Sequence, residues 1–115
     1  MPTIYHLVAH DRWREWPADA DYLPAEYAHD GFIHCTQGDE LMLQVANRFY
    51  RNTPGEFLLL VLDTDRLTAP LKWERPADEL APLFPHIYGP INRDAIIGER
   101  EMVRDTSGNF IGIAG

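Results

Sequence analysis

Three of the five histidines lie in the middle of short apolar segments, each close to an aromatic residue. The segments are Tyr5-His6, Phe32-Ile33-His34 and His86-Ile87-Tyr88. Side chains alternate between the two faces of a β-strand, so His34 shares a face with Thr36, and His86 shares one with Tyr88. If the three strands are neighbours, imidazoles and aromatic rings line one cleft, where they could move protons and stack on a ligand. The alternative is three unconnected histidines, each satisfied by a hydrogen bond in the core.

Carboxylates are the other candidates for chemistry. Glu74 follows a tryptophan at the end of a short predicted strand, where it could be a general base, a ribose-hydroxyl acceptor or a plain surface charge. Glu99 and Glu101 share one strand face, a pattern typical of a solvated surface. Cys35 alternates away from His34 and therefore lacks an adjacent base, so we expect a small buried residue rather than a nucleophile.

The sequence carries few signs of metal or phosphate chemistry. The histidines show no paired spacing such as His-x-His or His-x-x-x-His, although a metal-dependent hydrolase that uses three histidines is a competing hypothesis. There is no Gly-rich phosphate loop and no Gly-x-Ser-x-Gly motif. His10 and His29 fall in predicted loops, where we expect surface positions.

Composition narrows the class of protein. The 115 residues are 45% hydrophobic and 24% charged, which predicts one globular domain over residues 1–115. The net charge of −8 argues against broad nucleic-acid binding but allows a small anionic ligand held by one or two arginines. The longest apolar run, Phe57 to Leu62, is strand-sized, so no membrane association is expected. One cysteine excludes an internal disulfide, and the first residues lack a signal-peptide pattern, so we expect a cytoplasmic protein.

Hydrophobic periodicity predicts an α+β fold, with a mixed or antiparallel sheet and a few helices packed on it. Thr36 to Asp39 fits a capping box that opens a helix running to about Tyr50. The nearly continuous apolar segment 56–63 is typical of a central strand covered on both faces. The loop over residues 75–83 is long enough to be a functional flap. Strands are predicted at 3–9, 31–35, 56–63, 71–74, 85–89, 96–104 and 110–113, with a first helix at 11–16 and one helical turn at 25–28.

Several segments together resemble a family catalogued as domain of unknown function 952. They are IYHLV, the tryptophan at Trp13, DGFIHCT, LLLVLD, LKWE and FPHIYGPI, and the match runs from Ile4 to about Ile97. The family name gives no activity. The resemblance implies a fold similar to the ADP-ribosyltransferase and RNA 2'-phosphotransferase group, in which a split α+β sheet forms a cleft for NAD or an ADP-ribosylated intermediate.

The same resemblance implies roles for individual residues. His6, in a Tyr-His pair on the first strand, would contact a ribose hydroxyl, and His34 would be the second motif residue. The third motif position, often Glu, falls on Glu74, on the pair Glu99 and Glu101, or on a residue that is not acidic. The arginine set of the RNA phosphotransferases has no clear match here.

The leading hypothesis is a small protein that binds an NAD-like or nucleotide ligand and transfers ADP-ribosyl, with NAD as a substrate rather than a resident cofactor. Glu74 and His34 would be catalytic, and Tyr88 would stack on a ring of the ligand. The expected ligand-binding residues are His6, Thr36, His86 and Tyr88. The second hypothesis is a non-enzymatic binding or interaction module with a degenerate cleft, and the third is the metal-dependent hydrolase.

Overall fold

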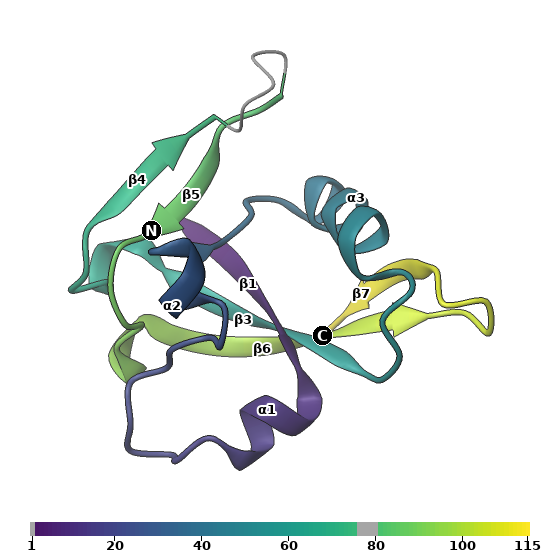
Figure 1. Ribbon diagram of the computed structural model, residues 1–115, viewed down its shortest axis with the longest axis horizontal. Helices are drawn as coiled ribbons and strands as arrows, with labels where there is room; N and C mark the ends of the chain where they lie inside the picture. The colour runs from purple at the N-terminus through teal and green to yellow at the C-terminus, as the bar shows by residue number, and fades with distance from the viewer. Residues whose placement is uncertain (1, 76–80) are drawn as a thin grey trace.

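The computed structural model describes residues 2–75 and 81–115 (Figure 1). Its helices are α1 (His10–Glu15), α2 (Tyr27–Asp30) and α3 (Asp39–Tyr50), with short 3-10 turns at Thr64–Arg66 and Arg93–Ala95. Its strands are β1 (Thr3–Ala9), β2 (Ile33–His34), β3 (Phe57–Asp63), β4 (Leu71–Glu74), β5 (Phe84–Ile87), β6 (Ile96–Arg104) and β7 (Phe110–Ala114). The predicted α+β class is confirmed.

The strands form two antiparallel sheets. The larger sheet has the order β1-β3-β6-β7 and the smaller one the order β2-β5-β4. In the described residues, one isolated bridge links β1 to the segment after β2, where Tyr5 and Thr36 exchange backbone N–H···O bonds of 2.7 and 2.9 Å. The chain therefore passes from the smaller sheet to the free edge of the larger one within two residues of His34.

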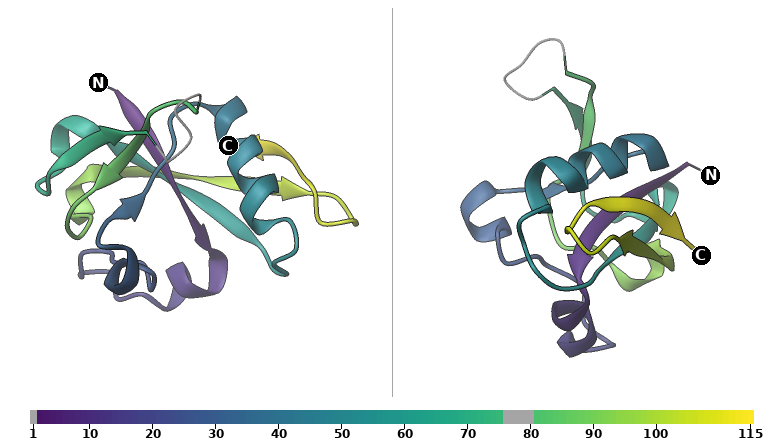
Figure 2. Two further views of the ribbon diagram at one scale, coloured as in Figure 1. Left: turned by 45° about the horizontal axis from the view of Figure 1, so that its top comes forward. Right: turned by 90° about the vertical axis from the view of Figure 1, so that its right-hand side faces the viewer.

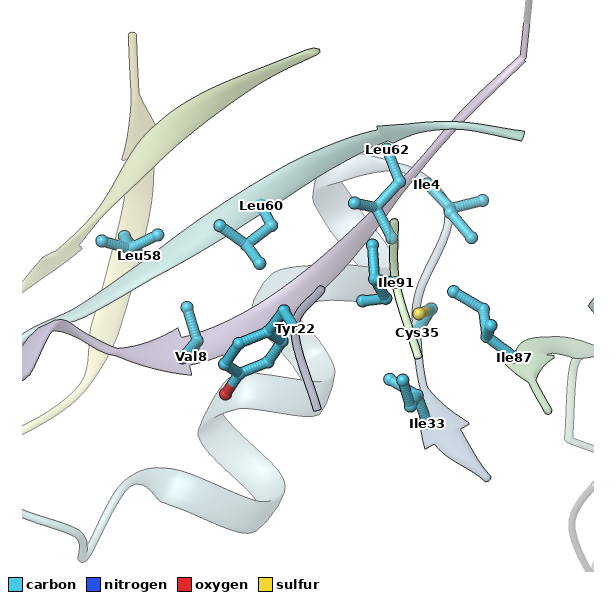
Figure 3. Packing of buried hydrophobic residues seen from close by; sticks show 10 residues of the cluster. All are labelled: Ile4, Val8, Tyr22, Ile33, Cys35, Leu58, Leu60, Leu62, Ile87 and Ile91. Carbon is cyan, nitrogen blue, oxygen red and sulfur yellow. The ribbon is translucent and has the colours of Figure 1, made fainter. Parts of the chain in front are cut away.

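Strand β3 lies between β1 and β6 and is buried on both faces, as its continuous apolar run predicts. Leu58, Leu60 and Leu62 point into one core cluster, which Figure 3 shows together with Ile4, Val8, Tyr22, Ile33, Cys35, Ile87 and Ile91. Phe57 and Leu59 point to the opposite face, where they meet Met42 and Ala46 of α3. Figure 2 shows α3 lying across that face of the larger sheet.

Helix α3 begins where the sequence predicts, but the predicted capping box is wrong. Its N-cap residue is Gly38, at φ 92°, and no side chain caps the first turn. Thr36 lies two residues before this N-cap, where it is buried and bonded through its backbone to Tyr5. The positive φ of Gly38 lets the chain turn sharply from that bridge into the helix. The flap predicted at 75–83 falls largely on residues 76–80, which lie outside the described residues.

Candidate functional site

Four aromatic rings converge on one face of the smaller sheet; we call them the ring cluster, formed by Phe32, His34, His86 and Tyr88. His34 and His86 are directly opposite each other on the antiparallel strands β2 and β5, and their ring centroids are 5.5 Å apart. Phe32 stacks on His86 at 4.2 Å and lies 4.6 Å from His34 and 5.5 Å from Tyr88. Cross-strand pairing thus brings together residues more than fifty positions apart in the sequence.

Glu74 at the end of β4 is bonded directly to the ring cluster. Its Oε1 accepts hydrogen bonds from the Tyr88 hydroxyl at 2.5 Å and from His86 Nδ1 at 2.9 Å. The Tyr88 bond and then the His86 bond hold the pKa of the Glu74 carboxyl below its usual value. The same bond from Tyr88 raises the pKa of that phenol. Because a carboxylate only accepts, His86 carries its proton on Nδ1 here.

Two charged residues that sequence reasoning missed flank the cluster. Asp30, the last residue of α2, lies 3.0 Å from His34 Nε2 and 3.0 Å from His29 Nδ1. These two bonds, the one with His29 first, lower the pKa of Asp30. Lys72 places its ammonium 4.9 Å from the centroid of the Tyr88 ring. Two sequence patterns could have indicated these residues. Asp30 lies four residues before His34, and Lys72 shares a strand face with Glu74.

His6 reaches this region through the backbone of His34 rather than through its ring. Its side chain is 3% exposed, and Nδ1 lies 2.8 Å from the carbonyl oxygen of His34. A carbonyl only accepts, so Nδ1 bears the proton and Nε2 carries a lone pair. That Nε2 is buried and has no hydrogen-bond partner among the described residues. Burial lowers the pKa of His6, which keeps the imidazole neutral near pH 7.

His6 and Thr36 line a small pocket of about 40 Å³ at the free edge of β1. We call it the His6 pocket; its described lining is Tyr5, His6, Leu7, Glu26, His34, Thr36, Met42, Val45 and Tyr50. His86, Tyr88 and Glu74 are not part of this lining. The structure therefore distributes the six expected site residues over two adjacent places, the ring cluster and the His6 pocket, and His34 belongs to both.

The remaining expected chemical groups lie elsewhere. Glu99 accepts a hydrogen bond from the Trp13 indole at 2.9 Å, and Glu101 is bonded to His10 Nε2. Both carboxylates thus anchor α1 to β6 instead of facing the ring cluster. Both histidines lie in short helices, α1 and α2, rather than in the predicted loops. The His10 side chain is half-buried at 16% exposure, whereas His29 is exposed as expected.

Cys35 is buried as predicted, and burial raises the pKa of its thiol. Within residues 2–75 and 81–115, no three His, Cys, Asp or Glu side chains are placed to hold a metal ion, so the hydrolase hypothesis gains no geometric support there. No helix in the described ranges is long and apolar enough to cross a bilayer.

Residues 7–99 match the model of the family described as "Protein of unknown function (DUF952)". The chain belongs to the DUF952 family. No curated protein matches it. The resemblance seen in the sequence is confirmed at the level of the family, and the likeness to ADP-ribosyltransferases stays a prediction.

Solved structures similar to this DUF952 chain come from the protein CC0527 of Caulobacter crescentus. A crystal structure is 27% identical with a TM-score of 0.77, and the match covers 95% of this chain and 93% of that one. A crystal structure of a double mutant is 26% identical with the same TM-score and coverage. A solution NMR structure is 28% identical with a TM-score of 0.72, covering 94% and 90%. These comparisons support the fold over nearly the whole chain and supply no reaction.

Proposed function

We propose that the ring cluster binds the nucleoside part of an NAD-like nucleotide, with Glu74 directed at the ribose, and that the protein transfers ADP-ribosyl. One observation carries the proposal. Four rings with centroids 4.2–5.5 Å apart lie beside a carboxylate that Tyr88 and His86 hold in place. Rings arranged in this way can stack on a flat aromatic ligand, and the carboxylate can accept a hydrogen bond from a hydroxyl group.

Stacking accounts for the ring-binding half of the proposal. Phe32 and Tyr88 are half-buried, and the His34 side chain is 57% exposed, so ring surface is accessible to a ligand. Stacking of a nucleobase on a protein ring contributes about 1–3 kcal/mol per base. Lys72, above the Tyr88 ring, adds a positive charge that a phosphate of the ligand would meet.

Glu74 accounts for the ribose half. Both donors from the cluster bind Oε1, and in the described residues no hydrogen bond reaches Oε2. The side chain is 39% exposed, so a ribose hydroxyl can donate to that second oxygen. The lowered pKa keeps the carboxyl ionised at neutral pH.

In the proposed transfer, the glycosidic C–N bond breaks and its electron pair leaves with nicotinamide. The ribose carbon becomes positively charged, and the ionised Glu74 stabilises that charge. The acceptor then forms a bond to the same carbon and releases its proton to solvent.

The ribose contact that the family resemblance implies for His6 is not part of this proposal. His6 is 3% exposed, and the pocket beside it measures about 40 Å³, whereas pockets for drug-sized ligands usually measure about 300–1,000 Å³. A ribose ring would have to widen the pocket before it could reach the imidazole. A non-enzymatic binding module is the second candidate, favoured by the openness of the ring cluster, which leaves the reacting bond exposed to water.

The test is an NMR titration of the histidine ring resonances with NAD and with ADP-ribose. We expect the His34 and His86 resonances to shift together and saturate. The resonances of His10, the first residue of α1, should stay unchanged, because its ring is bonded to Glu101 away from the ring cluster. Phe32→Leu should weaken binding about tenfold, because one stacking surface is lost. If neither His34 nor His86 moves at millimolar ligand, the proposal is wrong.

Turnover is tested separately by nicotinamide release from NAD. Glu74→Gln should abolish release and also weaken binding, by about tenfold, because the ribose hydrogen bond loses its charged acceptor. Glu15→Gln, an exposed position on α1, is the matched control. Saturable binding without any release by the unaltered protein would identify the binding module instead.

A further inference from the structure

The His6 pocket contains a buried acceptor without a donor. Nε2 of His6 has its lone pair free, lies in a side chain that is 97% buried, and meets no hydrogen-bond partner among the described residues. Leaving such a group unsatisfied costs about 1–3 kcal/mol. The imidazole cannot rotate to relieve this, because Nδ1 is bonded to the His34 carbonyl. A hydrogen-bond donor from outside the chain would complete it.

The rest of the lining also presents acceptors. Tyr5 exchanges backbone hydrogen bonds with Thr36 across the free edge of β1. Backbone groups of an antiparallel strand alternate in direction from one residue to the next, so the carbonyl and the N–H of Leu7 both point to the same edge, next to the pocket. Glu26 contributes a carboxylate, which can only accept. The hydroxyls of Thr36 and Tyr50 can either donate or accept.

The charge around the pocket is negative. Glu26 belongs to the lining, and Asp30 lies close enough to raise the pKa of Tyr50 by its charge, after burial and the charge of Glu26. The described lining contains no lysine or arginine. His34 and then Arg12 act on His6 in the direction opposite to Glu26, and the Arg12 guanidinium donates to the Tyr22 hydroxyl and the Leu23 carbonyl. A donor that carries positive charge is therefore favoured over a neutral one.

The size of the pocket limits the ligand. A pocket of about 40 Å³ suits a small ligand of a few heavy atoms. Met42 and Val45 supply an apolar wall for a short hydrocarbon. A nucleobase or a sugar ring is larger than the pocket, and the Glu26 carboxylate in the lining disfavours a phosphate.

We propose that the His6 pocket binds the end of a primary alkylammonium group. Its three N–H bonds would be donated to His6 Nε2, the Glu26 carboxylate and the Leu7 carbonyl, and its first methylenes would lie against Met42 and Val45. The pocket shares His34 with the ring cluster, but the three proposed acceptors lie outside that cluster. Ammonium binding therefore does not depend on nucleotide binding, and each proposal can fail without the other.

The experiment is a titration of ¹⁵N-histidine-labelled protein with ethylammonium chloride, with the His6 Nε2 resonance as the readout. Nε2 should move upfield in a saturable manner as it begins to accept a hydrogen bond. Ethanol, a neutral donor of the same size, should bind at least fivefold more weakly, and sodium chloride at equal ionic strength should have no effect. Addition of NAD instead of ethylammonium should shift the resonances of His34 and His86 and leave the His6 Nε2 resonance unchanged.

Glu26→Gln removes the charge and keeps the shape, and it should weaken ethylammonium binding about fivefold, which corresponds to about 1 kcal/mol for an accessible ion pair. Glu15→Gln is the control for a change in net charge. A His6 resonance that ignores ethylammonium overturns the proposal. Equal responses to ethanol and ethylammonium, or equal affinities in Glu26→Gln and the unaltered protein, also overturn it and reduce the pocket to a water site.

Discussion

Replacing His6 by asparagine should make the stability of the protein less sensitive to pH just below neutrality. In the unfolded chain a histidine has a pKa of about 6.5. In the folded chain burial lowers the pKa of His6, because the charged imidazole would lose its hydration. Below about pH 6.5 the unfolded state therefore binds a proton that the folded state does not, and the free energy of unfolding decreases as the pH falls.

One proton bound only by the unfolded state gives a slope of up to about 1.4 kcal/mol per pH unit. This slope begins near the unfolded pKa and ends where the pH reaches the lowered pKa of the folded state. Above about pH 7 both states are neutral, and His6 then makes no pH-dependent contribution. The amide nitrogen of asparagine can take the place of Nδ1 and donate to the His34 carbonyl, so the variant keeps the hydrogen bond at this position.

Urea unfolding of both proteins between about pH 5 and pH 8 measures the effect. The difference between the two curves isolates His6 from the other titrating groups. The carboxyls of Asp30 and Glu74, whose pKa values are lowered, stabilise the fold above their unfolded pKa and lose that contribution only at more acidic pH. Parallel stability curves for His6→Asn and the unaltered protein would refute the assignment of His6 as a buried neutral histidine.

Three further predictions concern a thiol, a turn and the carboxylate of the ring cluster. The Cys35 thiol should react with a disulfide reagent only when the protein unfolds, because it is buried and its pKa is raised; rapid reaction under native conditions would contradict this. Gly108→Ala should destabilise the protein by about 1–3 kcal/mol in thermal unfolding, and by more than Gly38→Ala. Both glycines have φ 92°, but a Cβ at Gly108 would lie 2.8 Å from a backbone oxygen after α3, whereas Gly38 faces open space; equal losses would refute the steric argument. Tyr88→Phe should raise the pKa of Glu74 toward its ordinary value, because the Tyr88 hydrogen bond is the largest cause of its lowering. A ¹³C NMR titration of the carboxyl measures this pKa, and an unchanged value would contradict the hydrogen bond.

The elements that local patterns describe well are those with strong periodicity. The continuous apolar run of β3 predicts a strand buried on both faces, and helical spacing of apolar residues predicts α3 to within a few residues. The turn over residues 105–109 is equally local, because Asp105 accepts hydrogen bonds within that segment. These features depend on contacts between residues that are close in the sequence, so sequence patterns predict them.

The candidate site is predicted less completely because strands change partners. Alternation places His34 and Thr36 on one face, yet β2 ends at His34, and Thr36 is bridged to β1 and buried. Alternation also places His6 on the same face of β1 as the buried Ile4 and Val8. This pattern predicts a buried histidine more reliably than the neighbouring Tyr5 predicts a ligand site. Partners that lie far away along the chain, such as Glu101 for the ring of His10, leave no local signal.

The order of the strands along the chain means that the ring cluster is completed late in synthesis. Strand β3 emerges from the ribosome soon after α3, so β1 and β3 can pair before β5 and β6 have emerged. Phe32 and His34 must wait for β5, and at about 5–20 residues per second Tyr88 follows Phe32 by about 3–11 s. During that interval β2 has no partner strand, and the pairing of β1 with β3 is the scaffold that is already available. The nascent chain thus acquires the centre of its larger sheet before the surface that we propose as its binding site exists.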